Sequence, residues 1–235
     1  MFHRDLKPEN VLLREAGGQL QPVICDFGLS IILSEADISA GGRPASEVGM
    51  EGTAEYLAPE SRTVSRHASE RVGFPSDVWS LGCMLLEMAG GQRAWSKHPE
   101  YKSSGDNISV GQMYKQCPLD FWSPKDVFAA FYEELRRDAA RNECLSFQRS
   151  PWPASFPVPK VCVEYLSAIK ACYAVSPRDR QSAARLRETL QKISSAWDVK
   201  TEYADPFRFL RAKLEVSAQA SAHRITCTLS TCRPK

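Results

Sequence analysis

One run of residues constrains the fold more than any other: a stretch about a third of the way along the chain in which apolar side chains fall on almost every side of a helix. We expect this helix to begin with Ser76 as its N-cap and to end at Gly90 and Gly91. A helix that is apolar almost all round is typical of a buried position. The apolar residues that recur at helical spacing are Val78, Leu81, Leu85 and Met88.

Three further helices are predicted around it. Ser123, followed by proline and then by an acid at the third position, is a strong start for a helix that runs to about residue 135. Residues 160–173 are amphipathic, and a last helix starts near Ser182 and continues to Trp197. Residues 149–159 hold four prolines and are read as a linker.

The first third of the chain has a different pattern. Two short apolar runs, residues 11–13 and 23–25, stand on either side of Gly17 and Gly18, which predicts a β-hairpin. Residues 34–56 show little periodicity and are expected to form a loop. Residues 91–122 are also expected to be irregular.

Composition excludes several classes of protein. The 235 residues are 43% hydrophobic and carry a formal net charge of +2, so no electrostatic footprint for nucleic acid is present. No stretch approaches the 18 apolar residues of a membrane span, and no signal peptide is visible. The eight cysteines form no Cys-x-x-Cys pair, so we expect reduced thiols and a cytoplasmic or nuclear location.

Five short motifs follow one another in a fixed order. They are HRDLKPEN at residues 3–10, DFG at 26–28, APE at 58–60, DVWSLG at 77–82 and PRDR at 177–180. One such triplet would be weak evidence, because it arises often by chance. Five in order, at workable spacing, form a specific pattern.

This series resembles the catalytic domain of eukaryotic-type serine/threonine protein kinases, and specifically its C-terminal lobe. The resemblance implies a mainly α, protein-kinase-like fold: a helical bundle with a short β-hairpin at the catalytic and metal-binding loops. It implies a lobe over residues 1–196, with an activation segment at 26–60 and an irregular insert at about 92–159. Residues 197–235 are expected to be a partly disordered tail.

The resemblance assigns roles to the residues that carry chemistry. Asp5 matches the carboxylate that accepts the proton of the attacking hydroxyl, and Lys7 the cation that balances the transferring phosphoryl group. Asn10 and Asp26 match the ligands of Mg²⁺, which prefers oxygen donors. Thr53, in the segment before APE, pairs with Lys7 in the serine/threonine-type pattern. The residues implied to contact ATP are Lys7, Glu9, Asn10, Leu12, Cys25 and Asp26.

Other matched positions are structural. Asp77 is expected to cap amides of the catalytic loop, and Glu60 to form a buried ion pair with Arg180. His3 is implied to stack with a phenylalanine in an apolar column rather than to act as a base. Phe27 and Gly28 complete the metal-binding triplet.

Arg4 implies regulation, because in the family an arginine at this position pairs with a phosphate on the activation segment. We favour Ser46 as the phosphorylated residue, which would make an upstream activating kinase a partner beside the protein substrate. The hydroxyl-bearing residues considered in the segment are Ser30, Ser34, Ser39, Ser46 and Thr53.

Three readings stay open between a structural and a functional role. Cys25 is a small packing residue or a thiol that ATP-site electrophiles can reach. An aromatic cluster at Phe128, Phe131 and Tyr132 is core or a recognition surface. The helix face formed by Arg136, Arg137 and Arg141 is solvated surface or a nucleic-acid patch.

The chain also departs from the family pattern, which requires a Gly-rich loop, a strand lysine and a helix glutamate. No Gly-x-Gly-x-x-Gly occurs in the sequence, and only two residues precede His3. Two explanations follow. The chain is part of a longer kinase and is inactive alone, or it is a short non-catalytic, pseudokinase-like binding or scaffold module.

Overall fold

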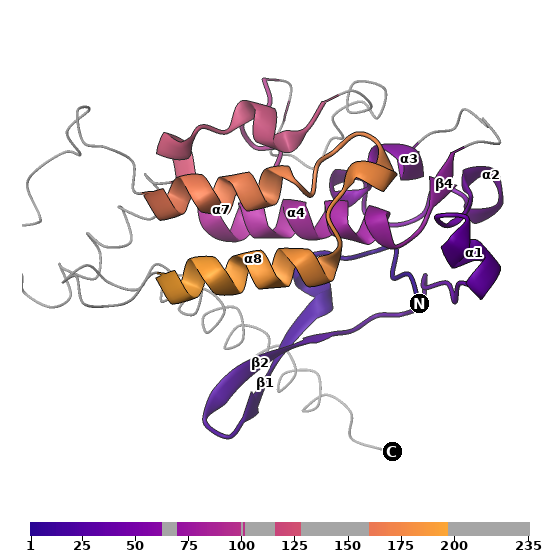
Figure 1. The fold of residues 1–235 in the computed structure, drawn as a ribbon, viewed down its shortest axis with the longest axis horizontal. Helices are drawn as coiled ribbons and strands as arrows, with labels where there is room; N and C mark the ends of the chain where they lie inside the picture. Colours follow the sequence, from indigo (N-terminus) through magenta and orange to yellow (C-terminus); the bar gives the residue numbers. More distant parts are fainter. Residues whose placement is uncertain (63–69, 100, 102–115, 128–159, 197–235) are drawn as a thin grey trace, which may run out of the picture.

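The computed structural model describes residues 1–62, 70–99, 101, 116–127 and 160–196. Within these ranges helices gather around one long central helix, and a β-hairpin projects away from them (Figure 1). The α-helices are α1 Glu35–Ser39, α2 Ala45–Val48, α3 Pro59–Arg62, α4 Phe74–Gly90, α7 Lys160–Lys170 and α8 Ala183–Ala196. The strands are β1 Val11–Ala16, β2 Gln19–Ile24, β3 Arg43–Pro44 and β4 Arg71–Val72. Short 3-10 turns lie at Pro8–Asn10, Ala54–Tyr56, Pro118–Phe121 and Pro177–Asp179.

The central helix α4 begins earlier than the sequence predicted. Its N-cap is Gly73, and Ser76 lies in the first turn, where its hydroxyl accepts a hydrogen bond from the Gly73 amide. The expectation that Ser76 is the N-cap was therefore wrong, because a serine at the third helical position can satisfy the same free amide from inside the helix. The C-terminal end is where it was expected. Gly91 adopts a left-handed conformation (φ +70°), and its N–H donates to the Glu87 carbonyl at 2.8 Å.

The main core forms where α4 packs against α7, and α7 packs against α8 (Figure 1). Trp79 of α4 is buried and meets the ring of Tyr173 edge to face, with centroids 4.9 Å apart. Gly82 allows this approach, since a Cβ there would come within 2.8 Å of the Cys172 side chain. Leu186 of α8 closes the far side of this core. The all-round apolar pattern of α4 thus corresponds to burial on most of its faces.

Strands β1 and β2 form an antiparallel hairpin whose register runs from Val11 opposite Ile24 to Ala16 opposite Gln19. Gly17 and Gly18 make the turn with positive φ angles of 61° and 73°, which glycine adopts without steric cost. The hairpin carries the catalytic loop at its start and the DFG motif at its end.

Residues 34–56 are more ordered than the loop that the sequence predicted. They contain α1 and α2, and β3 between them pairs with β4 through Arg43 opposite Val72. A reciprocal cap starts α1: the Ser34 hydroxyl accepts from the Asp37 amide at 3.1 Å, and the Asp37 carboxylate accepts from the Ser34 amide at 2.9 Å. Elements of two to five residues are too short to leave a hydrophobic period in the sequence, so periodicity missed them.

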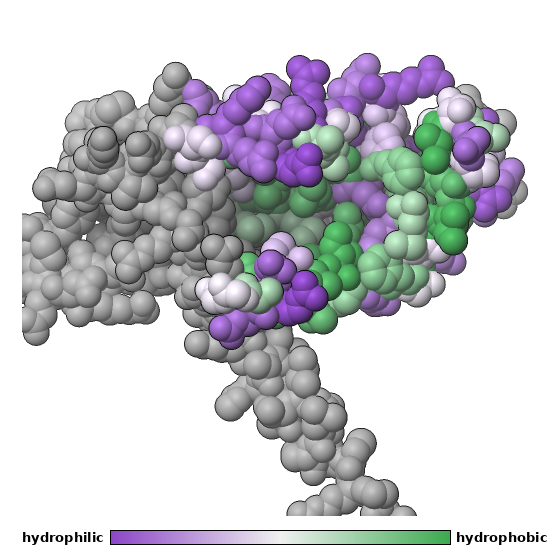
Figure 2. All heavy atoms as spheres, turned by 60° about the horizontal axis from the view of Figure 1, so that its bottom comes forward, coloured by the Kyte–Doolittle hydropathy of each residue, from purple (hydrophilic) through white to green (hydrophobic). Residues whose placement is uncertain are grey.

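A broad apolar groove of about 1640 Å³ runs between α4, the hairpin and the turn that precedes α8. Figure 2 shows hydrophobic surface gathered around a hollow on this face. Leu13 is half-buried and lines the groove, whereas Leu12 is 41% exposed. The other residues that contribute large apolar side chains include Val11, Ile24, Leu81, Leu85 and Met88.

Some expectations fall partly or wholly outside the described residues. Ser123 and Asp126 form the predicted reciprocal cap, with Asp126 accepting from the Ser123 amide at 2.7 Å, and residues 124–127 are helical. Cys25, Cys83, Cys117 and Cys172 are free thiols. No helix in the described ranges is both long and apolar enough to cross a membrane. The predicted residues and ranges that lie outside the description include Phe128, Phe131, Tyr132, Arg136, Arg137, Arg141, the linker 149–159 and the tail 197–235.

A buried ion pair joins α3 to the turn before α8. The guanidinium of Arg180 donates to both carboxylate oxygens of Glu60, at 2.6 and 2.7 Å, and Ser76 donates to the same carboxylate at 2.7 Å. Arg180 also lies over the ring of Trp79, 5.1 Å from its centroid. The pair is fully enclosed, with 0% and 6% of the two side chains exposed, so each charge depends on the other.

Replacing Arg180 with methionine should lower the free energy of unfolding by about 3–5 kcal/mol, because the Glu60 carboxylate would remain buried without its partner. Urea denaturation measures the change, and Arg178→Met, at an exposed neighbouring position, is the matched control. A loss of less than about 1 kcal/mol for Arg180→Met would contradict the importance of this pair.

Candidate phosphoacceptor site

The catalytic-loop motif is held by the N-terminal end of α4. The Asp77 carboxylate accepts hydrogen bonds from the backbone amides of His3, at 2.8 Å, and Arg4, at 3.0 Å. Arg4 has a positive φ of 76°, a costly conformation for a side chain of its size. Burial raises the pKa of Asp77, and the two amide hydrogen bonds oppose this shift. The strained turn is thus held by a carboxylate from the core helix.

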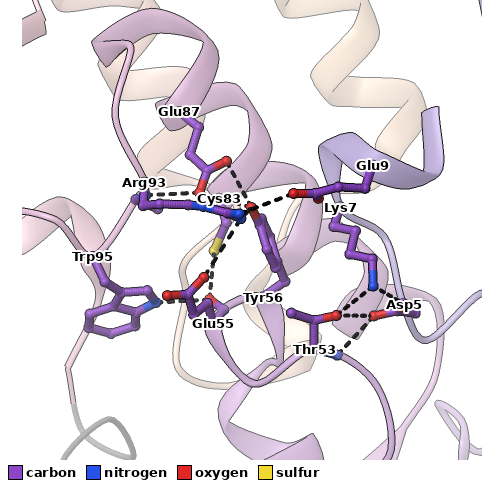
Figure 3. Close-up of polar contacts among 11 residues, drawn as sticks. Asp5, Lys7, Glu9, Thr53, Glu55, Tyr56, Cys83, Glu87, Arg93 and Trp95 are labelled. Carbon is purple, nitrogen blue, oxygen red and sulfur yellow. Dashed lines mark hydrogen bonds and ion pairs between the residues drawn. The ribbon is translucent and has the colours of Figure 1, made fainter. Parts of the chain in front are cut away.

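Asp5, Lys7 and Thr53 form a closed triangle of polar contacts (Figure 3). The Asp5 Oδ1 atom accepts from the Thr53 amide at 2.8 Å and from the Thr53 hydroxyl at 2.7 Å. The Lys7 ammonium lies 2.8 Å from Asp5 Oδ2 and donates to the Thr53 hydroxyl at 2.9 Å. Residues 46 positions apart in the sequence are therefore fixed against one another.

The environment of Asp5 favours its ionised form. Partial burial would raise its pKa, but hydrogen bonds from Lys7 and Thr53, together with the Lys7 charge, outweigh burial and hold the pKa below its ordinary value. The carboxylate is therefore ionised at neutral pH and can accept a proton from a neighbouring hydroxyl.

Thr53 reaches this position because the activation segment crosses the catalytic loop closely at Gly52. A Cβ at Gly52 would lie 2.5 Å from the Arg4 carbonyl oxygen, and its φ of +112° is unfavourable for other residues. Both the close approach and the positive φ require glycine at this crossing. Thr53 is the next residue and is therefore placed beside the catalytic loop.

Asn10 and Asp26 lie at the same end of the hairpin, because the Cys25 amide donates to the Asn10 carbonyl at 2.9 Å. The Asn10 side-chain nitrogen donates to Asp5, at 2.8 Å to its backbone oxygen, which leaves the Asn10 amide oxygen available. Asp26 is exposed, and its carboxylate makes no hydrogen bond or ion pair within the described residues. Two such oxygen donors fit the preference of Mg²⁺. No group of three metal-ligating side chains occurs in the described residues.

The other matched residues around the DFG motif fall into two groups. His3 is buried, hydrogen-bonds the Cys25 carbonyl at 3.0 Å through Nε2, and contacts the Phe27 ring at a centroid distance of 5.1 Å. Phe27 itself is 47% exposed. Leu12 and Gly28 also lie on exposed parts of the hairpin and its end. Cys25 is half-buried, and its contacts do not decide between a packing residue and a reactive thiol.

The side chain of Arg4 lies under the activation segment. It donates to the carbonyl oxygens of Leu29, at 3.2 Å, and Val48, at 2.7 Å. Its guanidinium also pairs with the Glu51 carboxylate at 3.0 Å. Ser46 is exposed in α2, two residues from Val48. A negative charge from the segment therefore already contacts Arg4, in the form of Glu51.

A second polar cluster lies beside the triangle and was missed by the motif analysis (Figure 3). The Tyr56 hydroxyl donates to the Glu87 carboxylate at 2.8 Å and accepts a hydrogen bond from Arg93. Arg93 also pairs with Glu9 at 3.1 Å and with Glu55 at 3.7 Å. Arg93 lies in a stretch that the sequence marked only as irregular, so no signal in the pattern identified it.

Comparison with known proteins agrees with this geometry. The family model described as the protein kinase domain matches residues 1–190. The chain therefore belongs to the protein kinase family.

Individual relatives match more limited regions. A serine/threonine-protein kinase, PKH3, of Eremothecium gossypii is 41% identical over 92 residues, which are 39% of this chain and 11% of the relative. The dual specificity protein kinase zak2 of Dictyostelium discoideum is 40% identical over 91 residues, 39% of this chain and 13% of the relative. Mitogen-activated protein kinase kinase kinase 5 of Mus musculus is 28% identical over 224 residues, 91% of this chain and 15% of the relative. The chain thus spans less than a sixth of the length of each of these proteins.

Replacing Thr53 with valine should raise the pKa of Asp5, because the hydroxyl hydrogen bond that stabilises the carboxylate would be lost. The group then gains its proton at a higher pH than in the unchanged chain. Titration of the Asp5 carboxyl carbon by NMR measures the change, and Thr189→Val, at a half-buried position of α8 far along the chain from the triangle, is the control. An unchanged Asp5 pKa would contradict the hydrogen-bond assignment.

Proposed function

We propose that this chain is the phosphoacceptor-side part of a serine/threonine protein kinase, which transfers the γ-phosphate of ATP to serine and threonine hydroxyls of a protein substrate. The triangle of Asp5, Lys7 and Thr53 is the single observation that carries the proposal. It places a carboxylate, a cation and a segment-borne hydroxyl within hydrogen-bond distance of one another.

Each residue of the triangle has a defined task in this proposal. Asp5 orients the substrate hydroxyl and receives its proton, which its ionised state allows. Lys7 offsets negative charge on the transferring phosphoryl group. Thr53 fixes both side chains and connects them to the activation segment.

The oxygen atoms of Asn10 and Asp26 would hold Mg²⁺, with Lys7, Glu9, Leu12 and Cys25 on the nucleotide side. When bound, the metal ion would supply charge neutralisation at the phosphate oxygens of ATP. Asn10 also orients Asp5 through its side-chain amide. This chain therefore contributes to both the proton-accepting and the metal-binding side of the reaction.

Replacing Asp5 with asparagine should lower kcat by roughly 10²–10⁴-fold, because the proton acceptor is removed while its shape is kept. Transfer of labelled phosphate from Mg-ATP to serine and threonine peptides measures the change in a polypeptide that joins this chain to a Gly-rich nucleotide-binding lobe. Asp179→Asn, an exposed residue, makes the same chemical change away from the site. Equal loss in both variants would contradict the role of Asp5.

The 235-residue chain alone is proposed to transfer phosphate negligibly, since it contains no Gly-x-Gly-x-x-Gly. The first measurement is the sequence of the transcript upstream of the Met1 codon. An in-frame Gly-rich loop and strand lysine would support a longer kinase. Robust phosphorylation by the purified 235-residue chain, lost in Asp5→Asn, would overturn the proposed inactivity.

The second candidate function is a non-catalytic binding or scaffold module. The apolar groove of about 1640 Å³ favours it, because apolar surface of this kind is typical of interaction sites. An in-frame stop codon directly upstream of Met1, together with no transfer by any polypeptide that contains the chain, would favour the module over the kinase.

Regulation is proposed to act through Arg4 and a phosphate on Ser46, added by an upstream kinase. The phosphate would compete with Glu51 for the Arg4 guanidinium and offers a stronger, bidentate partner. Mass spectrometry of the active kinase should find Ser46 phosphorylated. Full activity with residues 26–60 unmodified would refute this step.

A further inference from the structure

Arg93 contacts two parts of the chain that meet at the phosphoacceptor triangle. One nitrogen of its guanidinium lies 3.1 Å from Glu9, in the turn that follows Lys7. The other contacts the Tyr56 hydroxyl and lies 3.7 Å from Glu55. Its guanidinium carbon lies 5.8 Å from the centroid of the Tyr56 ring. Arg93 thus bridges the catalytic loop and the end of the activation segment (Figure 3).

The backbone around Arg93 is fixed on both sides. Gly91 reverses the chain after α4 in a left-handed conformation, and the Ala94 amide then donates to the Glu87 carboxylate at 3.1 Å. The buried Trp95 donates through its indole nitrogen to the Glu55 carbonyl at 2.9 Å. The guanidinium therefore projects from a well-held segment, although 42% of the Arg93 side chain is exposed.

Charge balance requires a cation at this point. Glu87 is half-buried, and Glu9 and Glu55 lie near different nitrogens of the same guanidinium. Burial would lower the pKa of Arg93, but Tyr56 and the three carboxylates outweigh burial and raise it. Without Arg93, three carboxylates would lie close together with no positive charge among them, which is unfavourable.

Both bridged parts lead directly to the triangle. Glu9 lies between Lys7 and Asn10 in one 3-10 turn, in which the Asn10 amide donates to the Lys7 carbonyl at 3.0 Å. On the other side, the Tyr56 amide donates to the Thr53 carbonyl at 2.9 Å. A displacement of either turn would therefore move Lys7 or Thr53 relative to Asp5.

We propose that Arg93 is a positioning residue for phosphoryl transfer, which acts by holding Thr53 of the activation segment against Asp5 of the catalytic loop. The part that concerns catalysis rests on the proposed kinase function. The positioning itself is a property of the folded chain and can be measured without any activity. Its predicted signature is the protection of the Thr53 amide from exchange, since that amide donates to the Asp5 carboxylate at 2.8 Å.

The test compares amide hydrogen exchange in Arg93→Ala and Arg93→Lys, each made in the 235-residue chain. The Thr53 amide should exchange about 3–10-fold faster in Arg93→Ala, because its hydrogen bond to Asp5 loosens. Arg93→Lys keeps the charge but not the two-pronged geometry, so it should restore part of the protection. Gln92→Ala, at the neighbouring exposed position, should change nothing.

The lysine variant separates positioning from simple charge. Full protection of the Thr53 amide in Arg93→Lys would mean that charge alone holds the segment, and it would overturn the proposal. Unchanged exchange of the Thr53 amide in both Arg93 variants would also overturn it.

The amides within α4 are the internal reference in the same samples. They should keep their protection in Arg93→Ala. Equal acceleration in α4 would indicate general destabilisation and contradict positioning. Failure of these measurements with a positive Asp5→Asn kinase assay would reject Arg93 alone. The reverse result would reject the kinase function and leave the positioning intact.

Discussion

The hydrogen bonds from the catalytic-loop amides to Asp77 are the interaction on which the site depends. They join the strained turn at Arg4 to the first turn of α4, the most enclosed helix of the described structure. A backbone in an unfavourable conformation persists only where its surroundings over-determine it. Contacts with the core therefore offset the unfavourable conformational free energy of that turn. The position of Asp5 depends on a helix that lies more than seventy residues later in the chain.

A second set of interactions holds the activation segment in place beside the catalytic loop. Glu60 is bound by Arg180 from the turn before α8, and the Tyr56 carbonyl accepts a hydrogen bond from Ser80 of α4 at 2.7 Å. Trp95 reaches the Glu55 carbonyl from the other side. Arg93 belongs to this set, because it connects the same segment to the catalytic loop. The triangle thus combines a catalytic loop held by Asp77 with an activation segment held at Glu55, Tyr56 and Glu60.

The sequence predicted the residues of the triangle well, because the motifs that contain Asp5, Lys7 and Thr53 have fixed spacing and distinctive letters. It also located α4, since a run that is apolar on every side has few alternatives to burial. The start of that helix was misplaced, because Ser76 can cap from within the first turn as well as from the cap position. Cap assignments of this kind depend on backbone angles that residue types do not determine.

The remaining differences have the same physical origin. Helix α1 is held by the reciprocal cap at Ser34, and α2 follows strand β3, which pairs with β4, and neither feature leaves a periodic pattern. Arg93 can contact Glu9 only because Gly91 turns the chain back after α4. A single arginine in an irregular stretch has no partners until the fold supplies them, and its partners Glu9, Glu55 and Tyr56 all come from distant parts of the chain.

The close crossing of Gly52 over the Arg4 carbonyl has a consequence for how such a chain can diverge. One residue added or removed between Gly52 and Glu60 would shift Thr53 away from Asp5 or Glu60 away from Arg180, because both ends of that stretch are held by these contacts. The distance between the two contacts therefore fixes the number of residues that can lie between them. Substitutions within this stretch keep that number, whereas an insertion or a deletion would break one of the two contacts.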